Sequence, residues 1–174
     1  MGLFLQILDH VKPYIAAYGV IVVFVLIYFE SFGAPVPGET GVITAGLLAA
    51  HGELQIIPLF VAVLAGSILG DSTGYLIGRF GGRALVRRFG PYIKLTPERL
   101  AAIEEKFRAR GAPLVAIARF LPLMRQLNGV IAGTMRMPWP TFLAANSVGA
   151  VLWTSVWTLG PYFFSEAFSA WHRP

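Results

Sequence analysis

The chain contains no cysteine, and charged residues make up only 13% of its 174 residues. Without cysteine, neither a disulfide framework nor a thiolate metal site can form. A soluble domain usually carries about a quarter charged residues, so this shortage argues against an ordinary soluble protein. Hydrophobic residues account for 56% of the chain and the mean hydropathy is +0.65. Lipid rather than water is therefore the expected solvent.

Signatures of catalysis are also lacking. The three histidines, His10, His51 and His172, are scattered, and the chain has neither a nucleophile elbow nor a phosphate-cradling glycine loop. We therefore expect no enzyme activity, no cofactor and no bound metal. The first residues lack a basic region and a small-residue cleavage site, so we expect no cleaved signal peptide.

Positive charge is concentrated in one segment. Nine of the fourteen Lys and Arg residues lie between Arg79 and Arg110. Short basic loops beside membrane spans stay in the cytoplasm, so this concentration indicates topology, with contact to anionic lipid as an addition. We expect a multi-pass protein with its N-terminus and loop 79–111 in the cytoplasm, and we expect no nucleic-acid partner.

Apolar segments predict an all-α integral membrane protein. Residues 1–13 are typical of an interfacial amphipathic helix, and residues 14–174 are expected to form a single membrane domain. Three long apolar segments predict spanning helices, at 14–32, 54–78 and 137–165. Within the basic loop, Thr96 is a suitable N-cap, Pro97 suits the first helical position, and Gly111 is expected to end the helix.

Two further apolar stretches, 33–50 and 112–136, are interrupted by proline, glycine and charge. They resemble each other: "PGETGVITAG" and "PLMRQLNGVIAG" each place a proline before a charged residue and end in similar glycine-containing runs. Paired half-helices of this kind point to a transporter site. We predict two opposed re-entrant hairpins, each followed by a span, in an inverted repeat. Such irregular backbone must be covered by protein or by a watery cavity, so we expect a chamber near the midplane.

Six ionisable residues lie in or beside apolar sequence: Glu30, Glu39, Asp71, Arg119, Arg125 and Arg136. A charge at the bilayer centre costs roughly 2.5–3.5 kcal/mol, so these side chains are expected to face the interior. Arg119 and Arg125 flank Pro122, and a guanidinium presents a fixed fork of donors that suits a phosphate. The alternative is internal pairing of the arginines with Glu39 or Asp71, and both interpretations are compatible.

The other charges have simpler alternatives. Glu39 suits the first turn of a helix, where the helix dipole stabilises an acid. Asp71 suits an interfacial pair with Arg79 or Arg83. Glu30 fits the outer end of the first span, and Arg136 is best explained by retention of positive charge inside.

Small residues recur every fourth position in the second span, at Ala62, Gly66, Gly70, Gly74, Gly78 and Gly82. Such ladders let helix backbones approach closely in lipid, so we expect a packing groove for a half-helix. The residues that we assign to the hairpins and their packing are Pro35, Pro37, Gly38, Gly70, Gly74, Gly78, Pro122, Gly129, Gly133 and Asn146.

Four motifs together resemble the DedA family of membrane proteins, which share the VTT (SNARE-associated) domain. They are "ESFGAPVPGE", "GDSTGYLIGRFGGR", "RFLPLMRQLNGVIAGTMRM" and "FLAANSVGAVLW", and they cover most of residues 20–165 in the family's order. The resemblance implies two opposed re-entrant hairpins packed with spanning helices. It also implies that the acids on which the family depends are Glu39 and Asp71, and that the essential arginines are Arg119 and Arg125.

The resemblance also implies a function. Bacterial relatives are linked to movement of undecaprenyl phosphate across the cytoplasmic membrane, driven by the proton motive force, and eukaryotic relatives scramble phospholipids. We therefore expect a flippase of the bacterial cytoplasmic membrane that uses polyprenyl phosphate and protons. Arg119 and Arg125 are expected to bind the phosphate, and the acids Glu39, Asp71 and Glu30 are expected to couple protons to transport. The alternatives are a proton-coupled carrier of small ions, such as an oxyanion or a cationic drug, and a non-transporting role in membrane organisation. Many relatives continue into a further helix, so we expect a second copy to cover the open flank as a homodimer.

Overall fold

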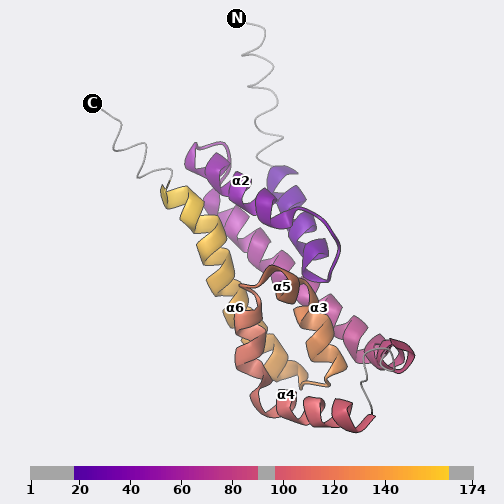
Figure 1. Cartoon of the computed structure of the whole chain (residues 1–174). Coiled ribbons are helices and arrows are strands. Elements are labelled where there is room, and N and C mark those ends of the chain that lie inside the picture. The colour runs from indigo at the N-terminus through magenta and orange to yellow at the C-terminus, as the bar shows by residue number, and fades with distance from the viewer. Residues whose placement is uncertain (1–17, 90–96, 165–174) are drawn as a thin grey trace, which may run out of the picture.

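The computed structural model describes residues 18–89 and 97–164, which are helical and contain no strand (Figure 1). The expected all-α fold class is confirmed, whereas the expected interfacial helix at residues 1–13 lies outside the described residues. The elements are a first helix Tyr18–Ser31, α2 Gly38–Ala50, α3 Ile56–Phe89, α4 Pro97–Ala118, α5 Pro122–Thr134, α6 Trp139–Thr154 and a π-helix Ser155–Leu159, after which α-helix resumes to Phe164.

Two helical stretches are long and apolar enough to cross a membrane, Ile56–Gly82 in α3 and Trp139–Phe164 in α6 and its continuation. They correspond to the second and third spans expected from the sequence. By contrast, α2 and α5 have 13 residues each. At 1.5 Å per residue each is about 20 Å long, which is shorter than a hydrocarbon core of about 30 Å.

The first hairpin combines the first helix, which lies within the expected span 14–32, with α2, which lies within the expected stretch 33–50. The first helix forms one arm of this hairpin and α2 forms the other. Gly19, near the start of the first helix, lies against Leu54, just beyond the end of α2, so the two helices run in opposite directions. The chain reverses after Ser31, where Gly33 adopts a φ of +101° and its N–H donates to the carbonyl of Glu30. Glycine tolerates this left-handed conformation and so ends the helix, and the prolines at 35 and 37 prevent it from resuming early.

The second hairpin also departs from expectation, because α4 does not end at Gly111 but continues to Ala118 with Pro113 inside it. Figure 1 shows α4 crossing the base of the molecule and then turning to run along α6. A proline inside a helix removes one backbone hydrogen bond and bends the helix. Gly111 allows the bend, since a Cβ there would lie 2.8 Å from the ring of Phe107. Arg119–Leu121 then reverse the chain into α5.

The basic segment 79–111 is more helical than a loop. Helix α3 runs to Phe89, well past the expected end at residue 78, and α4 begins at Pro97 as predicted. Arginine, leucine and alanine are good helix formers, so leaving the apolar region does not by itself end a helix. We refer below to the end of the molecule that holds the start of α4 as the α4 end, and to the opposite one, where α2 stops and α3 starts, as the α2 end.

The two hairpins point toward each other, and their turns meet about midway along the molecule (Figure 1). The described chain begins at the α2 end, opposite the basic segment, whereas the sequence led us to expect the N-terminus and that segment on the same side. The expectation for residues 1–17 lies outside the described part of the chain.

Glycines of α3 form the surface against which the first helix and α5 pack. A Cβ at Gly70 would collide with the backbone of Tyr28 in the first helix, and one at Gly78 would collide with the backbone of Val130 in α5. Gly74 lies where the end of the first helix approaches α5, with Phe32 and Val130 both in contact distance.

Glycines of α5 make the same close contacts in the other direction. Cβ atoms at Gly129 and Gly133 would collide with the backbone of α3 at Asp71 and Tyr75.

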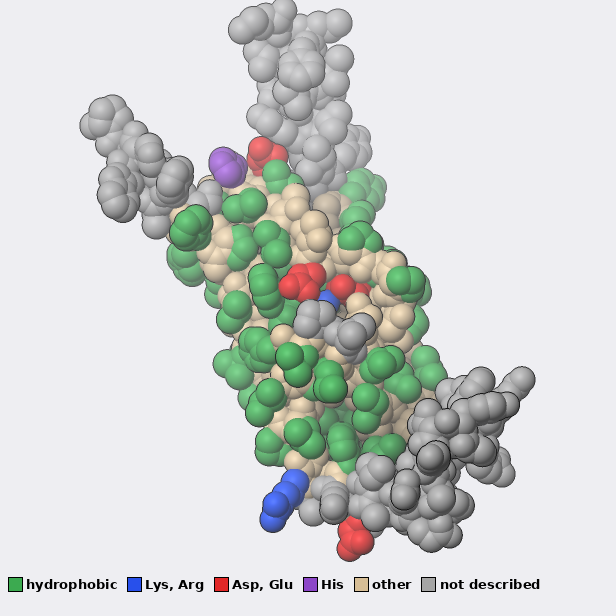
Figure 2. Space-filling view, viewed as in Figure 1, with side chains coloured by type: hydrophobic (Ala, Val, Ile, Leu, Met, Phe, Trp, Pro, Cys, Tyr) green, Lys and Arg blue, Asp and Glu red, His purple; other side chains and the backbone are tan. Residues whose placement is uncertain are grey.

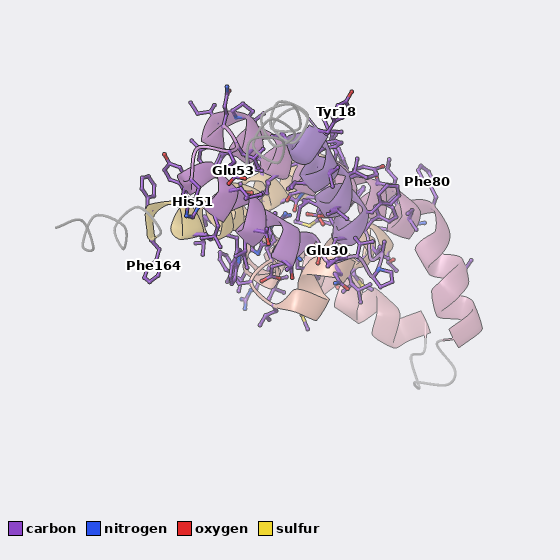
Figure 3. The ribbon with its side chains drawn as sticks, turned by 90° about the horizontal axis from the view of Figure 1, so that it is seen from above. Tyr18, Glu30, His51, Glu53, Phe80 and Phe164 are labelled. Carbon is purple, nitrogen blue, oxygen red and sulfur yellow. The ribbon has the colours of Figure 1, made fainter. Side chains whose placement is uncertain are left out.

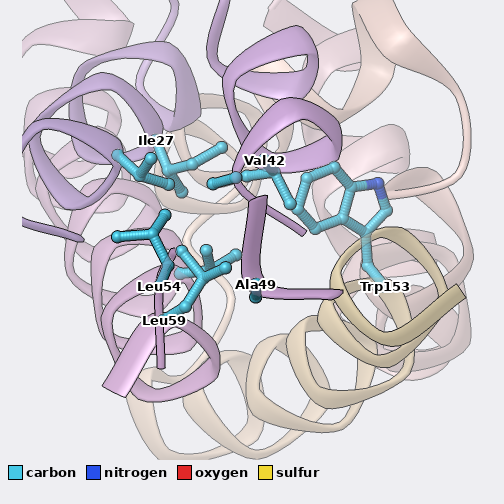
Figure 4. Close-up of a cluster of buried hydrophobic side chains, with 9 residues drawn as sticks. Ile27, Val42, Ala49, Leu54, Leu59 and Trp153 are labelled. Atoms are coloured by element: carbon cyan, nitrogen blue, oxygen red, sulfur yellow. The ribbon is translucent and has the colours of Figure 1, made fainter. Parts of the chain in front are cut away.

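Two apolar clusters lie on either side of the meeting turns. The cluster at the α2 end combines the first helix, α2, α3 and α6, and includes Ile27, Val42, Ala49, Leu54, Leu59 and Trp153 (Figure 4). The cluster toward the α4 end includes Tyr75, Val115, Met137 and Phe142. The polar residues described next lie between these clusters.

Candidate functional site

Charged side chains are buried where the two hairpins meet. Glu30, Asp71, Arg119 and Arg125 are each at most 5% exposed, whereas the side chain of Glu39 is 31% exposed. Seen from the α2 end, Glu30 lies within the bundle, and the aromatic side chains of Phe80 and Phe164 point outward (Figure 3). The structure therefore brings together five of the six ionisable residues singled out from the sequence.

One group of contacts centres on Arg119, in the turn between α4 and α5. Its Nη1 donates to Oδ2 of Asp71 on α3 and, at 2.6 Å, to Oδ1 of Asn146 on α6. Gly149 leaves room for this side chain, because a Cβ there would lie 2.8 Å from Cδ of Arg119. Asp71 is fully buried, so the interpretation as an interfacial carboxylate paired with Arg79 or Arg83 is wrong.

A second group centres on Arg125, in the first turn of α5. Its Nη2 lies 2.9 Å from Oε2 of Glu30 and 3.7 Å from Oε2 of Glu39. Its guanidinium carbon lies 4.4 Å from the centre of the Trp153 ring, a cation–π contact. Gly38 allows this arrangement, since a Cβ there would collide with the carboxylate of Glu30. Arg125 thus joins the two hairpins and α6.

Glu39 fits both interpretations that the sequence offered. It lies in the first turn of α2, where the helix dipole favours an acid, and it also pairs with an arginine of the opposite hairpin. The internal pairing of Arg119 and Arg125 with acids is likewise present. Arg136, in contrast, is exposed in the turn after α5, away from these contacts, with a φ of +54°.

Several buried N–H donors of the site have no acceptor among the described residues. They are Nε and Nη2 of Arg119, Nη1 of Arg125 and Nδ2 of Asn146. Buried polar groups in proteins are almost always hydrogen-bonded, and a guanidinium cannot lose its charge to avoid the cost. The donors therefore represent binding capacity of the kind that carboxylate or phosphate oxygens satisfy.

The formal charge of the site is slightly negative. Three carboxylates (Glu30, Glu39 and Asp71) outnumber two guanidiniums (Arg119 and Arg125), so the formal charge is −1 when all are ionised. An anion that enters would meet both the donors and the carboxylates.

The site reaches the surface beside α2. Glu39, at the start of α2, is the exposed member of the group. Figure 2 shows acidic side chains beside a basic one about halfway along the molecule, with many hydrophobic side chains above and below them. Glu39 is therefore the member of this charged group that connects it with the surface.

The remaining assigned residues shape the two turns. Pro35 and Pro37 lie in the turn before α2, and α5 begins at Pro122. Within the described ranges, no three His, Cys, Asp or Glu side chains are placed to hold a metal ion.

Sequence reasoning missed part of this region. Nothing in the sequence distinguishes Trp153 from the other aromatic residues of its apolar segment, yet it is 1% exposed and covers Arg125. Buried hydroxyl groups around the charges were also overlooked. Spacings of four, between Ser67 and Asp71 and between Thr154 and Thr158, place each pair on one helix face and were visible in the sequence.

Comparison with known proteins places this arrangement in a family. A family model for the VTT domain matches residues 36–163. The chain belongs to the VTT domain family. This confirms the resemblance to the DedA family, whose proteins share that domain.

Relatives of this VTT protein are named as membrane proteins. An uncharacterized membrane protein of Synechocystis sp. is 38% identical over 149 residues, which cover 86% of this chain and 68% of that protein. An uncharacterized membrane protein of Mycobacterium bovis is 37% identical over 155 residues, covering 87% of this chain and 71% of the relative. Together with the two long apolar helices, these relatives identify a helical membrane protein.

One relative has a different kind of name. An alkaline phosphatase-like protein of Lactococcus lactis subsp. cremoris is 33% identical over 136 residues, which cover 75% of this chain and 64% of that protein. No solved structure matches the chain.

Proposed function

We propose that this VTT protein is a proton-coupled transporter of a phosphate-bearing membrane lipid, and that the lipid is undecaprenyl phosphate or a similar polyprenyl phosphate. The observation that carries the proposal is the set of unpartnered N–H donors on Arg119 and Arg125, buried between two hairpins. A phosphate offers oxygens enough for these donors, and its charge matches guanidinium groups that remain ionised.

The phosphate enters beside Glu39 while the lipid tail stays in the bilayer. Its oxygens accept hydrogen bonds from Arg119 and Arg125, and the pairs of these arginines with carboxylates open in exchange. A phosphate monoester carries roughly −1.5 to −2 charges at neutral pH. A site with a formal charge of −1 would repel it. Glu39 and Asp71 therefore bind protons as the phosphate arrives, and Glu30 supports Arg125.

Protons also supply the driving force. Moving negative charge toward a negative cell interior costs about 2.3 kcal/mol per charge per 100 mV, so the phosphate requires roughly 3.5–4.6 kcal/mol at 100 mV. Protons taken up outside cancel this charge. The coupling of anion and protons thus follows from the charge of the site.

The membrane arrangement is part of the proposal. The two hairpins are re-entrant, and with α3 and α6 they form an inverted repeat in the bacterial cytoplasmic membrane. The short lengths of α2 and α5 and the opposed direction of the hairpins support this. The basic segment 79–111 lies in the cytoplasm, and the α2 end faces outward.

Single cysteines test the orientation, because the chain has none of its own. Glu53 and Arg110 are exposed near the α2 end and on α4, respectively. A membrane-impermeant maleimide should label Glu53→Cys in intact cells and Arg110→Cys only after the membrane is opened. The reverse pattern would invert the proposed topology.

Reconstituted vesicles test transport. A short-chain polyprenyl phosphate should cross the membrane faster with a pH gradient than without one, and Glu39→Gln and Asp71→Asn should each lose the pH-dependent part. Glu53→Gln is a matched control, since Glu53 is an exposed acid outside the site and should behave as wild type. Unchanged transport in both Glu39→Gln and Asp71→Asn would rule the proposal out.

The same donors also fit a carrier of small oxyanions, because inorganic phosphate presents equivalent oxygens. Ligands that bind the folded state raise the temperature of unfolding. Protection of the detergent-solubilised protein by short-chain polyprenyl phosphate, and not by inorganic phosphate, supports the lipid. The opposite result supports the small-ion carrier, and protection by neither favours a role in membrane organisation.

We further propose that the protein binds its phosphate without cleaving it, although one relative is named alkaline phosphatase-like. The groups that contact the proposed phosphate are guanidiniums, which bind oxygens but do not act as nucleophiles. The purified protein should therefore release no inorganic phosphate from the polyprenyl phosphate that it transports.

A further inference from the structure

Four buried hydroxyl groups have no hydrogen-bond partner among the described residues. They belong to Ser31, Ser67, Thr154 and Thr158, each at most 1% exposed. An unpaired buried hydroxyl is unfavourable, so four of them in one region call for an explanation.

Other hydroxyls of the same protein show the usual solution. In helices, serine and threonine commonly donate to the carbonyl four residues earlier. Ser72 and Thr73 of α3 do so, and so does Thr134 of α5. Ser67 lies only five residues before Ser72 in α3, yet it does not make this bond. Its hydroxyl therefore remains available to a group outside its own helix.

Ser67, Thr154 and Thr158 lie on the α2 side of the buried charges, and Ser31 lies at the level of those charges. Ser67 is one helical turn before Asp71, and Ser31 follows Glu30 and faces α3 at Gly70.

Thr154 ends α6, and Thr158 lies in the π-helix that follows, so both lie closer to the α2 end than Asn146. The π-helix packs on both α2 and α3. The carbonyl of Thr158 approaches α2 at Gly46, and its neighbour Leu159 borders a groove with Ile56 at the start of α3. The hydroxyls thus extend from the ion pairs toward one end of the molecule.

From this placement we infer that Ser31, Ser67, Thr154 and Thr158 line a proton path from the α2 end to Asp71. The inference deepens the proposed transport function and rests on it. A hydroxyl donates one hydrogen bond and accepts two, so it can receive a proton on one side and release its own on the other. Water molecules held by two or more of these groups would bridge the gaps between turns.

Each relay step leaves the hydroxyls unchanged. A proton from water at the α2 end enters the chain, and the last group releases one to the carboxylate of Asp71. The charged groups that face Asp71 are Arg119 and Arg125, with Glu30 and Glu39 beyond Arg125. As the phosphate draws the guanidiniums away, the carboxylate loses its hydrogen-bond donors and is free to accept this proton.

The α4 side has no equivalent set in the described chain. There the buried polar side chains donate to backbone oxygens: Tyr75 to Met137, Asn128 to Val115, and Thr134 to Val130. These groups are occupied and do not form a relay. The path is therefore one-sided, and it opens at the end that faces outward in the proposed topology.

Threonine-to-valine substitutions test the path, because valine keeps the shape and removes the hydroxyl. In vesicles that contain a pH-sensitive dye and short-chain polyprenyl phosphate, Thr154→Val and Thr158→Val should lose most of the proton uptake driven by an acidic exterior. Thr154→Ser retains a hydroxyl and should keep the uptake. Thr134→Val is the matched control on the α4 side and should behave as wild type.

Binding and stability separate the possible outcomes. Thr154→Val and Thr158→Val should still be protected from heat by the short-chain polyprenyl phosphate, and their own unfolding temperature should not fall, since an unpaired hydroxyl is removed. Normal proton uptake in Thr154→Val, Thr158→Val and their combination would overturn the path while leaving the proposed function intact. If the wild-type protein takes up no protons with the lipid, the proposed function fails instead.

Discussion

The two hairpins carry opposite charge and are held in different ways. The tip of the first presents the carboxylates of Glu30 and Glu39, and the tip of the second presents Arg119 and Arg125, so ion pairing joins the two turns. Along their lengths they differ. Helix α5 touches α3 backbone to backbone, whereas α2 and the first helix enclose an apolar groove of about 380 Å³.

This difference indicates which helices are fixed and which can shift. Close backbone packing at several glycines fixes α5 on α3, because neither helix can move without opening a gap. Helix α2 rests on the end of α6 and has free space on its other side, so it can shift at little cost. We therefore propose that α2 is the moving part of the acidic hairpin. The first helix, which packs on α3 at Gly66 and Gly70, is fixed, and so is the basic hairpin.

The largest effect is expected at the fully buried pair of the fixed hairpin. Arg119→Leu leaves the carboxylate of Asp71 buried without its cation. Breaking a buried pair from one side costs about 3–5 kcal/mol, so the variant should unfold at a much lower temperature in detergent. The double variant Arg119→Leu with Asp71→Asn removes both charges and should regain much of the loss. Equal stability of the single and double variants would show that the pair is not buried as described.

A smaller effect is expected where α5 lies on α3. A Cβ at Gly78 would collide with the backbone of Val130, and the collision cannot be relieved by rotating a side chain. Overpacking typically costs about 1–3 kcal/mol, and Gly78→Ala should lose stability by that amount. Gly81→Ala is the control, because nothing lies within 4 Å of a Cβ there and alanine favours the helix. A loss at both positions would indicate a general effect of the substitution, not close packing.

The corresponding glycine of the first hairpin should matter less. A Cβ at Gly46 of α2 would lie 2.8 Å from the carbonyl oxygen of Thr158 in the π-helix. If α2 can shift toward the groove beside it, Gly46→Ala should cost about 1 kcal/mol or less, since a relaxed contact costs less than a trapped one. Thermal unfolding of Gly46→Ala and Gly78→Ala side by side makes the comparison. A larger loss at Gly46 would reverse the assignment of the fixed and moving helices.

The sequence predicted most reliably the features that depend on local composition, such as apolar helices, and the burial of residues whose charge would be costly in lipid. Apolar runs predicted the helices α3 and α6, and the cost of burying Arg119, Arg125 and Asp71 predicted that these residues face the interior. The four-residue glycine spacing predicted close packing without naming the partner helices.

The failures concern chain direction and pairing. The reversal of the chain at Gly33, beside the arginines of the other hairpin, was not predicted, because the apolar run before it gives no sign of a turn there. The continuation of α4 through Pro113 was also not predicted, because a proline bends some helices and ends others, depending on tertiary packing. Which carboxylate pairs with which guanidinium is a long-range property that spacing along the chain does not determine.

The smallest effect concerns the residues that close α2 and α5. Both helices end in the same pattern, with the next residue in a left-handed conformation: Gly52 after α2, with φ +76°, and Arg136 after α5, with φ +54°. A non-glycine residue pays about 1–2 kcal/mol for this conformation, while glycine loses about 0.5–1 kcal/mol more backbone entropy on folding. Arg136→Gly should therefore stabilise the protein by about 0.5 kcal/mol.

The same comparison has a control at the other helix end. Gly52→Ala introduces the strain that Arg136 already bears and should destabilise the protein by a similar small amount. If Arg136 serves only to keep the α4 end inside, Arg136→Gly should leave lipid transport unchanged while weakening the topology bias in the labelling of Arg110→Cys. Loss of transport in a more stable, correctly oriented Arg136→Gly protein would instead show that the strained residue acts in the transport cycle, because strain is often retained where function requires it.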